Sequence, residues 1–180
     1  MKRITAILMG IGISLAFAGC TSQSLEGQQE QVNFFGMDTY MTITAYGEDA
    51  GEAVEEAQAR ILKLEKEWSV TDESSQIYQA NHSGESPVTL SDDTRDVVSF
   101  ALEMAEKTGG ALEPTIYPVL EAWGFTTDEN RIPAPDEIQT LLEHVGYEQV
   151  SLSGNELTLP EGVELDLGAV GKGYAGDAAA

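Results

Sequence analysis

Residues 163–174 have the sequence VELDLGAVGKGY, in which an alternating run leads into a cluster of glycines. Between residues 163 and 167, three aliphatic residues alternate with two acidic ones, and this period predicts a strand with one buried face. The glycines of residues 168–173 predict a tight turn. A helix is then expected to begin at Tyr174.

The glycine-rich segment is also a candidate anion site. A helix that begins after a turn presents unpaired backbone N–H groups and the positive end of its dipole. Lys172 adds a positive side chain in a chain that has only 9 lysines and arginines. The spacing differs from that of a Walker A loop, Gly-x-x-x-x-Gly-Lys-Ser/Thr. Composition alone does not distinguish a phosphate cradle from a tight structural turn.

Periodicity and capping residues predict the elements that precede this segment. A helix over residues 50–68 is expected from an apolar stripe between Val54 and Trp68. Ser91 is expected to cap a second helix, which ends at Gly109. The sequence therefore predicts an α+β fold with a mixed or antiparallel sheet and packed helices. The other expected elements are a β-like stretch over 32–46, an irregular region over 69–90, a short helix from Pro114 to Trp123, a helix from Pro135 to about Val145, strands over 150–152 and 157–159 joined at Gly154-Asn155, and a strand over 163–167.

The charge balance excludes some partners. The chain has 180 residues with 31 acidic and 9 basic side chains, a formal net charge of −22. Nucleic-acid binding needs a basic surface, and so does electrostatic attraction to an anionic membrane. The composition therefore argues against a nucleic-acid partner and against a polybasic membrane patch.

The first twenty residues are typical of a bacterial lipoprotein signal. Lys2 and Arg3 precede an apolar stretch that is too short for a stable membrane span. The stretch ends at Phe17-Ala18-Gly19-Cys20, with small residues directly before a cysteine. The alternative is an ordinary cleavage site with a cysteine nearby by chance. It is disfavoured because Cys20 is the only cysteine of the chain and lies at the one useful position.

This interpretation divides the chain into three parts. We expect residues 1–19 to be a lipoprotein signal peptide and residues 20–31 to be the lipidated Cys20 with a flexible, polar leash. The protein is then expected to be lipid-anchored to a bacterial cell membrane, exposed on the extracytoplasmic side and free of disulfides. The folded domain is expected over residues 32–180. Because its last helix reaches Ala180 without a cap, we expect it to be the N-terminal piece of a longer domain.

Two common hydrolase chemistries are not favoured. His82 and His144 have no partner at a metal-binding spacing. Cys20 is expected to be blocked by lipid, and no serine lies in a nucleophile-elbow sequence. The residues alone therefore indicate neither a zinc hydrolase nor a serine or cysteine hydrolase.

Three other segments each have a structural explanation when taken alone, as a strand start, a polar loop and a helix stop. In their order and spacing, together with the last segment, they resemble the ApbE family of exported FAD:protein FMN transferases. The resemblance extends from Phe34 to Ala180. It is carried by MDT at 37–39, SVT at 69–71 followed by Asn81, GALEPTI at 110–116 with WGF at 123–125, and LDLGAVGKGY at 165–174.

The resemblance implies a T-fold-like domain that is incomplete at its C-terminus. It also implies an enzyme that takes FAD as a substrate and needs Mg²⁺. A serine or threonine hydroxyl of a target protein attacks the phosphorus on the FMN side of the pyrophosphate, AMP leaves, and FMN stays attached as a phosphoester. The expected targets are flavin-accepting subunits of membrane redox complexes.

The resemblance also assigns site residues by position. The backbone carbonyl of Ala169 is expected to be a magnesium ligand, because a hard cation prefers oxygen. The remaining metal ligands and any catalytic residue are expected outside the present chain. The residues expected to contact FAD are Met37, Thr71, Ala111, Leu112, Glu113, Asp166 and Lys172.

Three positions depart from the pattern of the family. Asp38 and Glu113 stand where many members have glycine and aspartate, and Thr71 stands where many have a tyrosine that covers the flavin. The last departure leaves open an exported FAD pyrophosphatase, which would release FMN and AMP with water as the acceptor. A solute-binding lipoprotein is the alternative from another class. It would use the same anchor and leash but would not need the segment at 168–173.

Overall fold

The structure is a computed structural model that describes residues 29–127 and 129–180. The predicted signal peptide, Cys20 and the leash as far as residue 28 lie outside the described residues. In chain order the elements are β1 (Gln29–Gly36), β2 (Thr39–Tyr46), α1 (Ala50–Trp68), α2 (Gln76–Asn81), β3 (Val88–Thr89), α3 (Asp92–Thr108), α4 (Tyr117–Trp123), α5 (Pro135–Leu141), 3₁₀ turns at Leu142–His144 and Tyr147–Gln149, β4 (Ser151–Ser153), β5 (Glu156–Thr158) and α6 (Gly168–Ala179).

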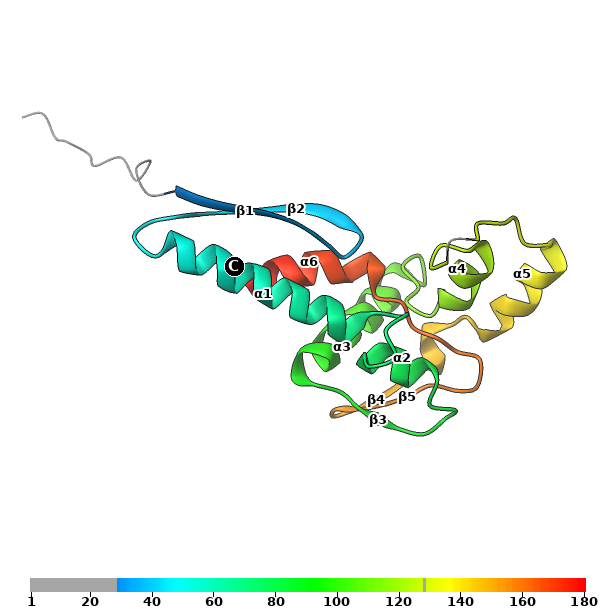
Figure 1. Ribbon diagram of the computed structural model, residues 1–180. Helices are drawn as coiled ribbons and strands as arrows, with labels where there is room; N and C mark the ends of the chain where they lie inside the picture. The colour runs from blue at the N-terminus through cyan, green and yellow to red at the C-terminus, as the bar shows by residue number, and fades with distance from the viewer. Residues whose placement is uncertain (1–28, 128) are drawn as a thin grey trace, which may run out of the picture.

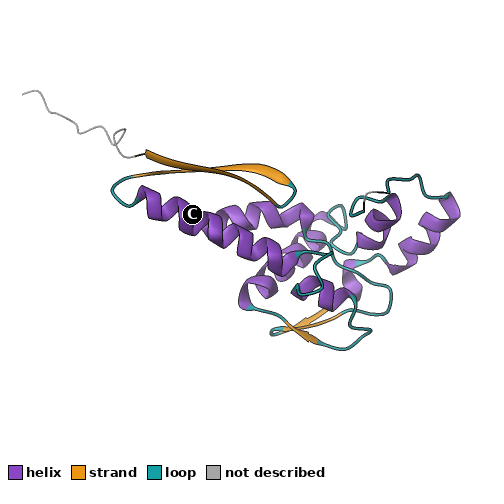
Figure 2. Cartoon of the chain, in the orientation of Figure 1, coloured by secondary structure: helices purple, strands orange, loops and turns teal. Residues whose placement is uncertain are grey.

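Helices lie between two small antiparallel sheets (Figure 2). One sheet is the hairpin of β1 and β2, and the other has the strand order β3-β5-β4. The predicted α+β class is therefore confirmed. None of the described helices is both long and apolar enough to cross a membrane.

The β1–β2 hairpin covers α1 with one of its faces (Figure 1). Phe34 pairs with Met41 on this inner face, and both side chains pack against the core. On the outer face, Phe35 pairs with Tyr40 in the solvent. Residues 29–31, predicted as part of the leash, are the first residues of β1. Backbone pairing with residues 44–46 does not depend on their polar side chains, which stay exposed.

Helix α1 is the element around which the others pack. It begins at Ala50 and ends at Trp68, as predicted, and its buried stripe ends in Leu64 and Trp68. It contacts the hairpin, α2, α3 and α6. Full burial of an aliphatic side chain such as Leu64 contributes about 1.5–3 kcal/mol, so the stripe is a major source of stability.

The second predicted helix, α3, is also confirmed with its caps. The Ser91 hydroxyl accepts a hydrogen bond from the backbone N–H of Thr94 at 3.2 Å, and Gly109 ends the helix in the left-handed conformation. The predicted strands around Gly154 and Asn155 form the β4–β5 hairpin.

Residues 69–90 were expected to be irregular, and this prediction was wrong in part. They contain α2 and the short strand β3. Ser75 caps α2, because its hydroxyl accepts from the backbone N–H of Tyr78 at 2.9 Å. A helix of six residues is too short to produce a detectable hydrophobic period.

The two helices around Pro133 are shorter than predicted. Helix α4 begins at Tyr117 rather than Pro114, and α5 ends at Leu141, where a 3₁₀ turn replaces its last predicted turn. Before α4, Thr115 is held instead by side-chain hydrogen bonds, since its hydroxyl donates to Glu113 and accepts from the Gly146 N–H.

The segment 163–174, which gave the strongest sequence signal, differs most from the prediction. Residues 163–167 alternate between buried and half-buried but form only one isolated bridge, between Glu164 and Ile116. The predicted turn at 168–173 is helical, because α6 begins at Gly168 and not at Tyr174. Among these glycines Gly168 is the crowded one, because a Cβ there would lie 2.8 Å from Asp166 Oδ1, whereas nothing lies within 4 Å of a Cβ at Gly173.

Candidate functional site

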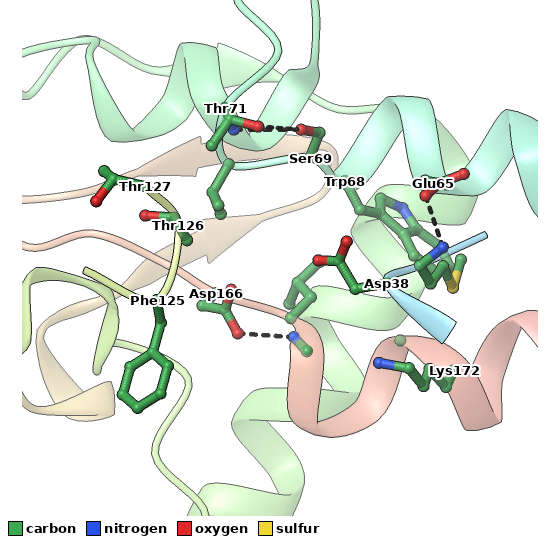
Figure 3. Close-up of a pocket in the computed structure, with 15 residues that line it drawn as sticks. Asp38, Glu65, Trp68, Ser69, Thr71, Phe125, Thr126, Thr127, Asp166 and Lys172 are labelled. Carbon is green, nitrogen blue, oxygen red and sulfur yellow. Dashed lines mark hydrogen bonds between the residues drawn. The ribbon is translucent and has the colours of Figure 1, made fainter. Parts of the chain in front are cut away.

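A cleft of about 500 Å³ opens where the β1–β2 turn, the end of α1, the loop after α4 and the start of α6 meet (Figure 3). Four residues that the resemblance assigned to FAD line it, from three segments of the chain. The lining residues are Met37, Asp38, Glu65, Trp68, Ser69, Val70, Thr71, Phe125, Thr126, Thr127, Asp166, Leu167, Gly168, Gly171 and Lys172.

Two parts of this lining differ in chemical character. The polar wall comprises Asp166, Leu167, Gly168, Gly171 and Lys172. The aromatic wall comprises Phe125, Thr126 and Thr127. Figure 3 shows Lys172 and Glu65 at one side of the cleft and Phe125 with the two threonines at the other.

The β1–β2 turn brings Met37 and Asp38 into the lining. Both have positive φ values, 50° and 53°, which side-chain-bearing residues rarely adopt. The backbone N–H of Met37 donates to Glu65 Oε1 at 2.6 Å, so a carboxylate on α1 holds the turn. Strained backbone of this kind concentrates at functional sites. Glu65 was missed by the sequence analysis, since nothing in the sequence distinguishes it from the other acidic residues of the helix.

The loop after α1 places Thr71 at the rim. Ser69 Oγ accepts hydrogen bonds from the backbone N–H groups of Thr71 and Asp72, at 3.2 Å and 3.0 Å. Ser75 Oγ in turn donates to the Ser69 carbonyl. Hydrogen bonds from Ser74 hold the pKa of the Asp72 carboxyl below its ordinary value. The loop is thus fixed by its own hydroxyl groups, and Thr71 is exposed.

The polar wall is held by segments that are distant in the sequence. Asn81 Nδ2 donates to the Leu165 carbonyl at 2.9 Å, and its Oδ1 accepts the Leu165 N–H at 2.8 Å. The backbone N–H of Asp166 donates to the Pro114 carbonyl at 2.8 Å. Side-chain and loop partners therefore replace the neighbouring strand that the sequence predicted for residues 163–167.

The start of α6 faces the cleft with both charge signs. Asp166 Oδ1 accepts the backbone N–H of Gly168 at 2.8 Å, and this carboxylate covers one of the free N–H groups of the helix start. Lys172 lies one turn further along the helix. It is the only basic residue among the described lining residues, against Asp38, Glu65 and Asp166.

Three predicted contact residues lie outside the cleft lining. Ala111 is exposed, and Leu112 packs against the core. Glu113 is committed to structure: Oε1 accepts from the N–H and the hydroxyl of Thr115 at 3.0 and 2.7 Å, and Oε2 accepts the Tyr147 N–H at 3.2 Å. This segment supports the polar wall through Pro114. Contact of these three residues with FAD stays a prediction.

Ala169 lies in the first turn of α6, next to the lining residue Gly168. The resemblance implies that its carbonyl is a magnesium ligand, and this stays a prediction; as a carbonyl of the helix it points along the axis toward the N–H four residues later. Among the described residues, no group of three or more His, Cys, Asp or Glu side chains could hold a metal ion. Asp38 and Asp166 supply suitable oxygen atoms, but they do not complete a magnesium site.

The aromatic wall follows α4, in the WGF motif that the sequence analysis noted without giving it a role. Gly124 ends α4 with a φ of 81°, and Phe125, Thr126 and Thr127 follow in the lining. Thr126 Oγ1 lies 3.3 Å from the hydroxyl of buried Tyr117. Burial raises the pKa of Tyr117, which keeps this hydroxyl protonated.

Comparison with known proteins gives a consistent result. The model of the ApbE family matches residues 37–180. The FAD:protein FMN transferase of Salmonella typhimurium is 30% identical over 89% of this chain and 47% of its own length. That of Haemophilus influenzae is 25% identical over 98% of this chain and 54% of its own length.

Two solved structures share the fold. The ApbE protein of Thermotoga maritima superposes with a TM-score of 0.81 and 30% identity, covering 84% of this chain and 51% of that one. The flavin transferase ApbE from Vibrio cholerae has a TM-score of 0.76 and 25% identity, covering 84% and 52%. The chain spans about half the length of the curated relatives it matches. It belongs to the ApbE family.

Proposed function

We propose that this chain is part of a magnesium-dependent FAD:protein FMN transferase and contributes much of its FAD site. One observation carries the proposal: a single cleft collects Met37, Thr71 and the pair Asp166 and Lys172, from three segments that are far apart in the sequence. The relatives from Salmonella typhimurium and Haemophilus influenzae bear the name of this activity.

The polar wall has the chemistry to receive the pyrophosphate of FAD. Lys172 can pair with a phosphate oxygen, and the start of α6 contributes the positive end of a helix dipole. In the proposed reaction a Ser or Thr oxygen of the target forms a bond to the FMN-side phosphorus. The bond from that phosphorus to the bridging oxygen breaks, AMP leaves with the electron pair, and the hydroxyl proton is released.

The charges of the cleft support a requirement for a cation. Three carboxylates oppose one lysine in the lining, so an anionic pyrophosphate would meet net negative charge. Magnesium, when bound, supplies charge neutralisation at the pyrophosphate. The Ala169 carbonyl, as the resemblance implies, and the lining carboxylates of Asp38 and Asp166 would contribute to holding it, and the remaining ligands are proposed to come from elsewhere in the protein.

The proposed location of the enzyme is the outer face of a bacterial membrane. Lipidation at Cys20 would hold the enzyme near flavin-accepting subunits of membrane redox complexes, so that enzyme and target meet in two dimensions. Labelled palmitate should enter the wild-type protein and not the Cys20→Ser variant. Equal labelling of both would contradict the anchor.

The activity is tested with the full gene product, FAD, Mg²⁺ and a flavin-accepting protein domain. A fluorescent acceptor band on a denaturing gel, lost on chelation with EDTA, supports transfer. Release of FMN and AMP without a labelled acceptor would mean hydrolysis of FAD instead. Intact FAD would contradict both enzymatic activities. The Lys172→Ala variant should lose at least tenfold in kcat/KM. Lys107→Ala is the control and should keep its kcat/KM, because Lys107 is exposed and lies outside the cleft lining.

A further inference from the structure

Phe125 is the one side chain of the cleft lining that combines an aromatic ring with high exposure. It is 69% exposed, whereas Trp68, the other aromatic residue of the lining, is 6% exposed. The Trp68 Nε1–H donates to Thr94 Oγ1 at 3.2 Å, and its ring meets Tyr174 edge-on at 5.7 Å. Trp68 is therefore committed to the core, and the face of Phe125 is available.

The backbone beneath Phe125 holds the ring in solvent. Its N–H donates to the Leu120 carbonyl at 3.1 Å, and the Arg131 N–H donates to the Trp123 carbonyl at 3.2 Å. Gly124 is closely packed, since a Cβ there would lie 2.2 Å from the Glu129 carbonyl oxygen. The loop is thus built to present Phe125 rather than to bury it.

The exposure of Phe125 differs from that of the exposed aromatic pair on the β1–β2 hairpin. Phe35 and Tyr40 are also exposed, but they pair with each other across the β1–β2 hairpin. Phe125 stands beside two threonines instead, and small polar Thr71 also lines the cleft. This arrangement leaves one aromatic face beside small side chains, which suits a flat ring.

We propose that Phe125 is a binding residue on which a planar ring system of FAD stacks while the pyrophosphate lies toward Lys172 and the polar wall. The inference rests on the proposed function, because FAD is the substrate that carries flat rings at both ends of a pyrophosphate. Stacking on an aromatic side chain is strong for any heteroaromatic ring, so either isoalloxazine or adenine can be the partner.

The test measures FAD affinity of the full gene product by quenching of flavin fluorescence. Phe125→Ala should raise the Kd for FAD about tenfold, which is the effect of losing one stacked ring. Phe125→Tyr should retain affinity close to that of wild type. Phe125→Leu should lose most of it, because the apolar area remains but the aromatic face does not. Ile132→Ala is the matched control: this residue is 85% exposed and lies outside the lining.

Two smaller probes identify the ring. If Phe125→Ala raises the Kd for FMN but not for ADP, the ring stacked on Phe125 is the isoalloxazine. If it raises the Kd for ADP but not for FMN, the stacked ring is adenine. Unchanged Kd values for FAD and for both probes, in a variant that unfolds at the wild-type temperature, would overturn the inference. If the Phe125→Ala variant unfolds below the wild-type temperature, the Kd values of Phe125→Leu and Phe125→Tyr for FAD are compared instead. Equal Kd values for these two variants would overturn the inference.

The outcomes separate this inference from the proposed function. A wild-type protein that binds FAD through Phe125 but labels no acceptor contradicts the transferase and supports the stacking. A protein that labels its acceptor with unchanged FAD affinity in Phe125→Ala contradicts only the stacking. A wild-type protein that does not bind FAD overturns both.

Discussion

The two walls of the cleft are held in place in different ways. The polar wall depends on partners that are distant in the sequence, since Asn81 holds Leu165 and Pro114 holds Asp166. The aromatic wall depends largely on hydrogen bonds within residues 117–131. A wall tied to the core should fail together with the core, whereas a locally held wall can be distorted while the rest of the domain stays folded.

The largest effect is expected from breaking the polar wall at Asn81. Asn81→Ala leaves both backbone groups of buried Leu165 without a partner, and this should lower the free energy of unfolding by about 3 kcal/mol. Urea denaturation measures it. Asn33→Ala is the control, because Asn33 is exposed on β1 and should cost within about 0.5 kcal/mol. Equal losses in both variants would mean that Asn81 does not hold the wall.

The aromatic wall is broken at Gly124. In Gly124→Ala the added Cβ would lie 2.2 Å from the Glu129 carbonyl oxygen, at a residue whose φ is 81°. We expect the free energy of unfolding to fall by about 2 kcal/mol. Gly154→Ala is a matched control, since its φ is 60° but nothing lies within 4 Å of the added Cβ. It should lose only about 1 kcal/mol. If the two variants are equally stable, the loop accommodates the added methyl group and is not tightly held.

A smaller effect is expected at the β1–β2 turn, which also lines the cleft. Glu65→Ala removes the acceptor of the Met37 N–H and should cost about 1 kcal/mol and weaken FAD binding severalfold. Glu65→Gln keeps an acceptor oxygen and should recover most of both. Glu55→Ala, an exposed carboxylate on the same helix, should change neither quantity. Failure of Gln to recover either quantity would show that the charge, rather than the hydrogen bond, matters.

The smallest effect concerns half-buried Glu164, beside the polar wall. Burial, with a contribution from the Glu121 carboxylate, raises its pKa above the ordinary value of 4.5. The folded state then binds this proton more tightly than the unfolded state, so stability falls as pH rises from 4.5 through the folded pKa. Glu164→Gln should therefore be more stable than wild type at neutral pH, as urea denaturation measures, and the gain should vanish below the unfolded pKa. Exposed Glu161→Gln should show no such pH dependence.

Sequence reasoning predicted the long elements well and the short ones poorly. The stripe of α1 repeats over several turns and the caps of α3 mark both of its ends, so both helices were predicted correctly from local signals. Helix α2 has six residues and gives no period. Residues 163–167 have the burial alternation of a strand, and only their hydrogen-bond partners, Asn81 and Pro114, distinguish them from one.

The site was predicted in part. Met37, Thr71, Asp166 and Lys172 were identified through the resemblance to the ApbE family, and the structure brings them to one cleft. Glu65 could not be predicted, because its role depends on the turn that lies above α1 and not on its neighbours in the sequence. Phe125 belongs to the WGF motif, but only its exposure in the cleft indicates a role in binding.

The sequence by itself determined the α+β class, the main helices, the family and the chemical character of the segment at 163–174. Those properties depend on periodicity, caps and local motifs, which act between residues close in the chain. Only the tertiary structure decided that this segment runs into a helix rather than a turn, and which side chains share the cleft. The physical reason is that glycines permit both conformations. In the folded chain the Gly168 N–H donates to Asp166 Oδ1, and Asp166 itself is held by the Pro114 carbonyl, a partner that only the tertiary structure brings near.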